Sequence, residues 1–446
     1  MPNAIETSRL AAPVNTSERI NIIDSLRGIA ILGILLMNIP AFGLPGTAHD
    51  PSLRNEFGTI NYYTWFAVDW FPEGSQRALF SMLFGAGIIL FISRQEKKLD
   101  GIWPADYFFR RQLWLLFFGL FDAYILLWYG DILFDYACLG MIMFAFRRLS
   151  PKKLLIGAGV CFLLMLAREN RDLYLDKKVI HRGEAIATQD TSVTKLTPLQ
   201  KEYHGAMMEF KERNEFDKRI KRMEMSILKT TTTYERLYEY RSNIYAEGVM
   251  KYLYYMLWDV LLFMFIGMAF FKMGILTGTA PTRLYALLCV IGLGLGLTIS
   301  YFRLQPMIDA KFNWYDYTKN VNFSFYELSR TLRALGIFGL IMLMFKSGWF
   351  NWLFKLMRPV GQMAFTNYLT QSIICGLFFY GVGLGMAGSL ERHEVYLFVG
   401  AVWLVQIIWS HIWLRYFNFG PMEWLWRSLT YWKRQPFKKN STRTTT

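Results

Sequence analysis

The sequence is poor in charge and in cysteine, and it lacks the motifs of common soluble enzymes. Only 19% of its 446 residues are charged, against about 25% in an average soluble domain. The four cysteines lie far apart inside apolar runs, which excludes a disulfide framework and a zinc site. The chain has no Walker, dinucleotide-binding or zinc-peptidase motif, so we predict no metal. This composition excludes a disordered, collagenous, coiled-coil or small secreted protein, and we do not expect an ordinary soluble enzyme.

Long apolar runs are present instead of charge. Hydrophobic residues make up 53% of the chain and aromatic residues 17%. A membrane-spanning helix needs about 20 apolar residues. Ten runs approach that length, at residues 22–44, 78–92, 112–129, 132–146, 154–167, 252–271, 284–302, 328–345, 360–386 and 395–414. The predicted fold class is therefore all-α, a polytopic membrane protein of about ten transmembrane helices. The aromatic run at 60–71, which holds Asp69, is predicted as an interfacial helix.

The net charge of +15 follows the predicted topology. With the N-terminus inside, the inner segments hold 24 Lys and Arg against 7 Asp and Glu. The outer segments, apart from one long loop, hold 8 against 11. The positive-inside rule requires this asymmetry. An even number of spans places both termini in the cytoplasm at a bacterial inner membrane. The surplus of Lys and Arg is then explained by the orientation of the chain in the lipid bilayer. We therefore expect no nucleic-acid partner.

Five segments follow from these limits. Residues 1–21 are predicted as a cytoplasmic N-terminal segment and 415–446 as a basic cytoplasmic tail. Residues 22–167 and 252–414 form two membrane blocks of about five spans each. Residues 168–251 form a large extracytoplasmic loop, whose stretch at 198–225 is charged and helix-prone. We expect a helical cap there, and a flexible linker is the alternative. No small-residue cleavage site follows the first apolar run, so that run is predicted as an anchor.

Polar residues inside the apolar runs are the candidate site residues, because ionisable groups at membrane depth are costly. Arg27 and Asn38 are eleven residues apart on the first run. That spacing places them on one helix face and about 16 Å apart along it. The alternative for Arg27 is an anchor paired with Asp24, and for Asn38 an interhelical hydrogen bond.

Further polar groups fall toward the outer half and suggest a shared cavity. Asp131 ends the turn Trp-Tyr-Gly-Asp at 128–131, where capping the next helix is the alternative role. Arg330 and Arg333 suit an anionic partner. The remaining members of this group are Asn38, Arg77 and Asp259. Asp122 and Asp259 are each predicted to pair with a basic group or to be protonated.

The ninth run carries two amides on one helix face, Asn367 and Gln371. Such amides either hold helices together or bind a polar group of a ligand. The five histidines form no metal or triad pattern, and the default for each, including His49 in the outer loop, is a solvated or interfacial side chain.

Five blocks of the sequence resemble the YeiB-like family of bacterial membrane proteins, catalogued as domain of unknown function 418. They are DSLRGIAILGILLMNIPAFGLP (24–45), RALFSMLFGAG (77–87), LLWYGDILFDYACLG (126–140), GQMAFTNYLTQSIICGLFFYGVGLG (361–385) and WLRYFNFGPMEWLWRSLTY (413–431). The blocks occur in family order and run nearly end to end. The family commonly has His where this chain has Asp122, which argues against a histidine base at that position.

The D-x-x-R-G start, with Asn38 eleven residues after Arg27, also resembles the first span of transmembrane acyltransferases of the heparan-α-glucosaminide N-acetyltransferase type. That resemblance implies transfer of an acyl group from cytoplasmic acyl-CoA to an extracytoplasmic acceptor, such as a glycan or a lipid-linked molecule. It implies a role for Arg27 near the donor phosphates and for Asn38 near the reaction centre. It also implies an essential histidine in the region of His49.

The chemistry of acyl transfer extends this hypothesis. The reaction needs a base near the nucleophile, which Asp131 or His49 would supply. It needs a donor to the oxyanion, for which Asn38 is the candidate, and cations for phosphates, for which Arg110 and Arg111 join Arg27. The predicted substrate-binding residues are Arg27, Arg77, Arg330, Arg333, Asn367 and Gln371.

Three functions are therefore compared. We predict a membrane acyltransferase that uses acyl-CoA as a substrate and holds no bound cofactor. The alternative is a multispanning transporter or flippase for a small anionic or lipid-linked substrate. In a third hypothesis the protein is structural, and its polar residues only join helices.

Overall fold

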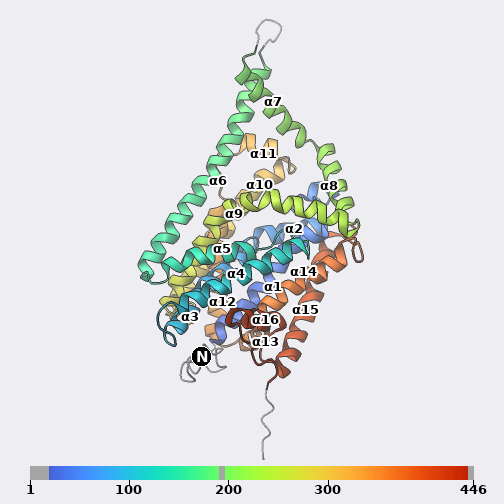
Figure 1. The fold of residues 1–446 in the computed structure, drawn as a ribbon. Helices are drawn as coiled ribbons and strands as arrows, with labels where there is room; N and C mark the ends of the chain where they lie inside the picture. The colour runs from blue at the N-terminus through green and yellow to red at the C-terminus, as the bar shows by residue number, and fades with distance from the viewer. Residues whose placement is uncertain (1–19, 190–195, 440–446) are drawn as a thin grey trace, which may run out of the picture.

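The computed structural model describes residues 20–189 and 196–439, and these ranges are built almost entirely from helices (Figure 1). An isolated bridge between Phe417 and Lys438 is the only β pairing in these ranges. In chain order the helices are α1 (Asn21–Gly43), η3 (Pro51–Arg54), α2 (Ile60–Trp70), α3 (Ser75–Glu96), α4 (Trp103–Tyr124), α5 (Leu133–Met143), η4 (Phe144–Phe146), α6 (Pro151–Ala187), α7 (Pro198–Arg213), α8 (Phe216–Thr230), α9 (Tyr234–Lys272), α10 (Thr282–Asp309), α11 (Trp314–Asn320), α12 (Tyr326–Ser347), α13 (Asn351–Gln362), α14 (Ala364–Phe379), α15 (Arg392–Tyr416) and α16 (Pro421–Tyr431).

Six helical segments within the described ranges are long and apolar enough to cross a membrane. They are α1, the α2–α3 unit (Ile60–Glu96), the second half of α9 (Leu253–Lys272), α10, α12 and α15. The prediction of an all-α membrane protein is therefore confirmed. The other four predicted spans lie on α4, α5, α6 and α14. The count of ten spans therefore stays a prediction.

Two helices are much longer than a membrane span requires. α6 has 37 residues and α9 has 39, which correspond to about 55–60 Å at 1.5 Å per residue, against about 30 Å for a hydrocarbon core. The projecting half of α6 is joined through α7 and α8 to the first half of α9, which lies across the bundle (Figure 1). α7 and α8 thus form an arch at the end of the bundle opposite α13 and α16. The predicted helical stretch at 198–225 thus falls on α7 and α8.

Local sequence explains how the arch is built. α7 starts at a capping box, in which the Thr197 hydroxyl accepts from the Gln200 amide at 3.3 Å and the Gln200 side chain accepts from the Thr197 amide at 2.9 Å. α11 is fixed to α6 by Lys319, which donates to Glu184 at 2.6 Å. This hydrogen bond lowers the pKa of the Glu184 carboxyl group.

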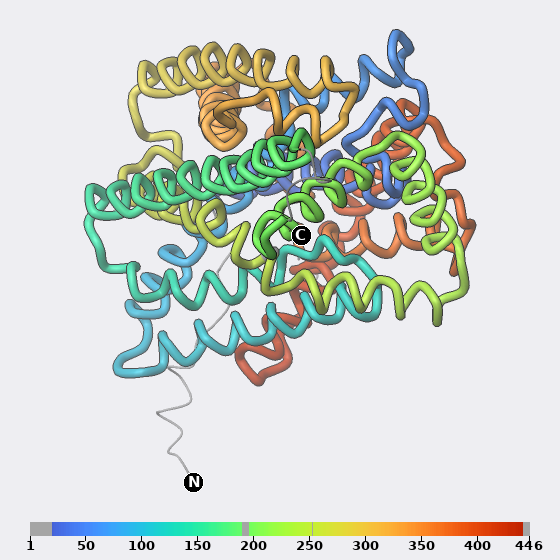
Figure 2. The backbone as a smooth tube through the Cα atoms, turned by 90° about the horizontal axis from the view of Figure 1, so that it is seen from above, coloured from blue at the N-terminus to red at the C-terminus, as the bar shows by residue number. Residues whose placement is uncertain are grey.

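The arch also contacts the helix bundle beneath it. Seen from above, it lies across the helices of the bundle (Figure 2). Arg219 on α8 forms an ion pair with Asp50 at 2.8 Å, and the amide of Gly381 donates to the carbonyl of Thr230 at 3.1 Å. The arch therefore covers the ends of α1 and α14.

Close helix packing fixes the register of α3 against α9. A Cβ atom on Gly267 would lie 1.9 Å from the carbonyl oxygen of Met82, and one on Gly85 would lie 2.2 Å from that of Met264. Only glycine allows both approaches. Two turns away from this crossing, the same register brings Arg77 on α3 beside Asp259 on α9.

The opposite end of the bundle carries two short helices, α13 and α16, close to the start of α1 (Figure 1). The Ser25 hydroxyl donates to the carbonyl of Phe354 on α13 at 2.8 Å. The Trp426 indole on α16 donates to the carbonyl of Arg111 on α4 at 2.9 Å. These contacts hold α13 and α16 against α1 and α4 at one end of the pocket described next.

Candidate functional site

A cavity of about 260 Å³ lies between α1, α3, α4, α14 and α16. Its wall follows α3 from Phe80 to Arg94 and continues to Lys98. The stretch of helix from Phe80 to Arg94 corresponds to about 21 Å, so the cavity is long and narrow. We call it the basic pocket because five cationic side chains line it against two carboxylates, Asp24 and Glu423. The five are Arg27, Arg94, Lys98, Arg111 and Arg427.

The two carboxylates are held by other groups. Asp24 pairs with Arg27 at 3.2 Å. Glu423 accepts hydrogen bonds at the start of α14 from the amides of Phe365 at 2.7 Å and Thr366 at 3.1 Å, and from the Thr366 hydroxyl at 2.6 Å. The positive helix terminus stabilises this carboxylate. Glu423 is thereby engaged in holding α16 on α14, and the lining keeps a surplus of positive charge.

The cations are held in place by aromatic rings. The Arg111 guanidinium lies 4.0 Å from the ring centre of Trp426 and 5.0 Å from that of Phe91. Arg27 and Arg427 are close enough to Arg111 to repel it. Guanidinium groups gathered in this way suit a planar, multiply charged anion such as a phosphate.

The rest of the pocket wall is apolar, apart from two side-chain amide groups whose oxygen atoms lack hydrogen-bond donors. Its wall is lined by aromatic and aliphatic side chains that include Phe84, Phe91 and Leu115. The Oε1 atoms of Gln95 and Gln112 are buried and accept no hydrogen bond from any residue that the structure describes. Buried acceptors are normally satisfied, so these two oxygens point to a ligand or water with N–H or O–H donors.

The far end of the pocket is formed by Leu133, Tyr136 and Tyr368. The Tyr368 hydroxyl donates to the carboxylate of Asp131 at 3.1 Å. Asp131 also accepts from the backbone amide of Phe134 at 3.0 Å, so it caps the start of α5 as well. Of the predicted site residues, Arg27 therefore lines the pocket and Asp131 lies directly behind its far end.

Two predicted catalytic residues lie elsewhere. Asn38 is half-buried on α1 and is not among the residues that line the basic pocket. His49 is exposed in the loop after α1, near Asp69 of α2. The pocket does not bring Asn38 together with Arg27, so the roles of Asn38 and His49 stay predictions.

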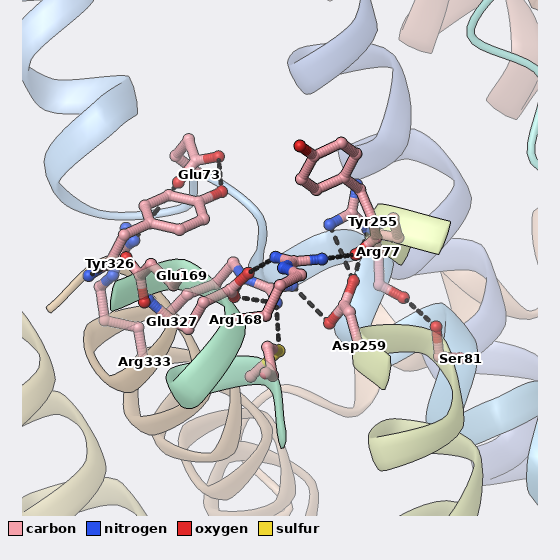
Figure 3. Close-up of polar contacts among 12 residues, drawn as sticks. Glu73, Arg77, Ser81, Arg168, Glu169, Tyr255, Asp259, Tyr326, Glu327 and Arg333 are labelled. Atoms are coloured by element: carbon pink, nitrogen blue, oxygen red, sulfur yellow. Dashed lines mark hydrogen bonds and ion pairs between the residues drawn. The ribbon is translucent and has the colours of Figure 1, made fainter. Parts of the chain in front are cut away.

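Arg77 and Arg330 belong to a buried ion-pair network (Figure 3). Asp259 forms ion pairs with Arg77 at 2.8 Å and with Arg330 at 2.6 Å. Arg330, which is fully buried, also pairs with Glu327 at 2.5 Å. Glu327 in turn pairs with Arg168 at 3.3 Å. The prediction that Asp259 pairs with a basic group is confirmed.

The same network continues to the start of α12 and the end of α2. Glu169 accepts from the amides of Tyr326 at 3.1 Å and Glu327 at 3.3 Å, and burial raises the pKa of its carboxyl group. Arg333 donates to the carbonyls of Asp69, Trp70 and Phe71 at 3.1–3.2 Å, and it pairs with Glu73 at 3.4 Å. Arg330 and Arg333 thus bind groups of the protein itself.

The two amides of the ninth predicted run lie between helices. Asn367 donates to the carbonyl of Val360 at 3.1 Å and to the Ser410 hydroxyl at 3.0 Å. Gln371 donates to the carbonyl of Ile31 at 3.3 Å and to Gln406 at 3.0 Å. These contacts join α14 to α1 and α15, and neither amide lines the basic pocket.

Sequence reasoning missed several residues that line the pocket. Gln112 carried a signal, since it is a polar residue inside an apolar run. Arg94 carried none, because it lies in the last turn of α3, where a cation is ordinary. Arg427 carried none either, because it falls in the segment predicted as a basic tail. Tyr136 and Tyr368 also carried none, since a tyrosine in an apolar helix is commonly a packing residue.

Comparisons with known proteins place the chain among bacterial relatives. Residues 270–433 match a family model described as "Protein of unknown function (DUF418)". The chain is 30% identical over 451 residues to the uncharacterized protein YxaH of Bacillus subtilis (strain 168), covering 96% of this chain and 98% of that protein. It is 31% identical over 431 residues to the uncharacterized protein YeiB of Escherichia coli (strain K12), covering 93% and 96%. No solved structure gave a significant match.

Proposed function

The chain belongs to the YeiB-like DUF418 family of bacterial proteins, and on this premise we propose that it is an integral-membrane acyltransferase whose donor is cytoplasmic acyl-CoA. Its acceptor is proposed to be an extracytoplasmic hydroxyl or amine, such as that of a glycan or a lipid-linked molecule. The resemblance of the first span to transmembrane acyltransferases motivates the proposal, and the basic pocket supports it.

The observation that carries the proposal is the set of groups that line the basic pocket. An acyl-CoA has a polyanionic head, a narrow arm with two amides, and a thioester at the end of that arm. The pocket has five cations and the unsatisfied amide oxygen of Gln95 toward one end, a second unsatisfied amide oxygen on Gln112 along its wall, and two tyrosine side chains at the other end. Phosphates would bind the guanidinium groups, and the amide N–H groups of the arm would donate to Gln95 and Gln112.

The far end of the pocket supplies groups for the reaction. Asp131 would accept the proton of the nucleophile through the hydroxyl of Tyr368. The Tyr136 hydroxyl, which lies 2.5 Å from the Ser81 hydroxyl, would stabilise the oxyanion. Asn38 and His49 lie farther along α1 and its following loop, and we assign them to the binding of the acceptor.

The proposal includes a topology. We propose ten spans, namely α1, α3, α4, α5, α6, α9, α10, α12, α14 and α15, with α2 at the interface. Both termini are then cytoplasmic, and residues 168–251 form the extracytoplasmic arch. The start of α1, the end of α3 and α16 all meet at the end of the bundle opposite the arch (Figure 1). The mouth of the pocket would therefore face cytoplasmic acyl-CoA, in agreement with the positive-inside rule.

Binding of CoA tests the first part of the proposal. The full-length protein is placed in lipid nanodiscs and titrated with CoA and acetyl-CoA by calorimetry. We expect saturable binding that is lost in Arg111→Ala and kept in Arg148→Ala, because the Arg148 side chain is 77% exposed and lies outside the pocket. Equal binding by both variants would contradict the assignment of the pocket.

Acyl transfer tests the second part. Release of free CoA thiol from acetyl-CoA is followed with an aminosugar as the acceptor probe, in proteoliposomes that present either face of the protein. We expect thiol release that needs both substrates and that falls in Asp131→Asn. Thiol release that is independent of the acceptor, or absent while CoA binds, would count against an acyltransferase.

A further inference from the structure

Two buried carboxyl groups meet behind the far end of the basic pocket. Asp122 lies on α4 and is fully buried, and Asp131 lies in the turn before α5 and is 6% exposed. The two groups are brought together by the close approach of α4 to this turn: a Cβ atom on Gly119, one helical turn before Asp122, would lie 2.7 Å from Asp131 Oδ2. The Ser372 hydroxyl donates to Asp122 Oδ2 at 3.2 Å, whereas Asp122 Oδ1 has no donor among the described residues.

The surroundings of this pair lack a balancing cation. In the described part of the chain, neither carboxyl group forms an ion pair within 4.0 Å, although Asp259 and Glu327 each have two such partners. The titratable groups that face the pair are Asp135 on α5, Tyr245 on α9, Tyr368 on α14 and Tyr380 after α14. The nearby guanidinium of Arg241 lies over the rings of Tyr129 and Tyr380 instead.

Electrostatics restricts the charge that such a pair can carry. Two adjacent carboxylates repel each other, and burial penalises each charge further. Carboxyl pairs in this situation share one proton, which occupies the hydrogen bond between them. The orphaned Oδ1 atom of Asp122 fits this arrangement, because a proton on either acid gives that atom a partner.

We propose that Asp122 and Asp131 form one buried proton-binding site, which holds a shared proton at neutral pH and takes up a second from the basic pocket through Tyr368. The shared proton follows from the pair alone. The uptake of the second rests on the proposed acyl transfer.

The second proton is taken up when the nucleophile attacks the thioester. The nucleophile forms a bond to the thioester carbonyl carbon and gives its proton to the Tyr368 oxygen, while Tyr368 passes its own proton to Asp131. The carbon–sulfur bond then breaks, and the sulfur leaves as a thiolate. The same path returns one proton to that sulfur, which gives the free thiol and restores the pair to one proton.

Infrared spectroscopy tests the shared proton without any substrate. The full-length protein in nanodiscs is labelled with carboxyl-¹³C aspartate, so that the carbonyl stretch of a protonated aspartic acid is identified by its isotope shift. At neutral pH we expect this band in the native protein and in Asp100→Asn, whose carboxyl group is exposed. We expect its loss in the double variant Asp122→Asn, Asp131→Asn.

Three outcomes would overturn the proton site. They are the absence of the band from the folded native protein, a band that persists in the double variant, and a band that sodium ions abolish and potassium ions do not. The native protein decides the first and the third even where the double variant fails to fold. Because this measurement contains no acyl-CoA, absence of the band from the native protein overturns the proton site, whereas absence of thiol release overturns the proposed function.

Discussion

The Tyr368 hydroxyl donates a hydrogen bond to Asp131 over 3.1 Å, while it accepts one from the backbone amide of Ile132 over 3.2 Å. Its ring forms part of the far wall of the basic pocket. One side chain therefore links the space where a thioester would end to the buried carboxyl pair. Removal of the Tyr368 oxygen atom would break this link and leave the aromatic ring in place.

We expect Tyr368→Phe to slow acyl transfer and to leave CoA binding intact. The phenylalanine ring preserves the wall of the pocket, but the proton path to Asp131 is broken, and general-base catalysis contributes about 10²–10⁴-fold to a rate. The measurement is kcat for thiol release beside the Kd for CoA. Tyr416→Phe, at a tyrosine that is 65% exposed, is the matched control. A change in Kd alone would assign Tyr368 to substrate binding.

Arg111→Lys is expected to weaken CoA binding about tenfold, although the charge is retained. Lysine loses the stacking on Trp426 and the paired N–H groups that match a phosphate. A desolvated cation–π contact contributes about 2 kcal/mol. The Kd is measured at two salt concentrations, because loss of stacking leaves the salt dependence largely unchanged. A native Kd in this variant would show that charge alone matters at this position.

Much of the fold could be predicted because a membrane imposes a simple pattern. Each apolar run of the sequence falls on a helix, and the helix-prone stretch at 198–225 falls on α7 and α8. Which residues line the pocket depends instead on how the helices pack, which the sequence pattern does not show. Asn38 and Arg27 share a helix face, yet the pocket follows α3, so it includes Arg27 and not Asn38. Arg427 reaches the pocket only because α16 packs against α4, a contact that no local pattern encodes.

Gly119→Ala is expected to destabilise the protein and to displace Asp131. A Cβ atom at this position would lie 2.5 Å from the amide nitrogen of Phe134 and 2.7 Å from Asp131 Oδ2. Overpacking of this kind costs about 1–3 kcal/mol. Thermal unfolding in detergent measures the loss. Gly159→Ala is the control, since nothing lies within 4 Å of its added Cβ atom, and there a helical alanine should stabilise slightly. Equal melting temperatures for the two variants would contradict the close approach of α4 to the Asp131 turn.

Arg330→Met is expected to be among the most destabilising single changes in the bundle. The guanidinium is fully buried and neutralises Asp259 and Glu327 together. Removal of one partner from a buried ion pair costs about 3–5 kcal/mol, because the remaining charge stays uncompensated.

Two further variants separate charge from packing at Arg330. Arg171→Met, at a side chain that is 63% exposed, should cost no more than about 1 kcal/mol. Addition of Glu327→Gln to Arg330→Met removes one of the two carboxylates that lose Arg330 as a partner, so it should restore part of the lost stability. Thermal unfolding of the three variants measures these effects. A double variant that is less stable than Arg330→Met would contradict this explanation. The destabilisation by Arg330→Met would then come from lost packing of the side chain and not from lost charge compensation.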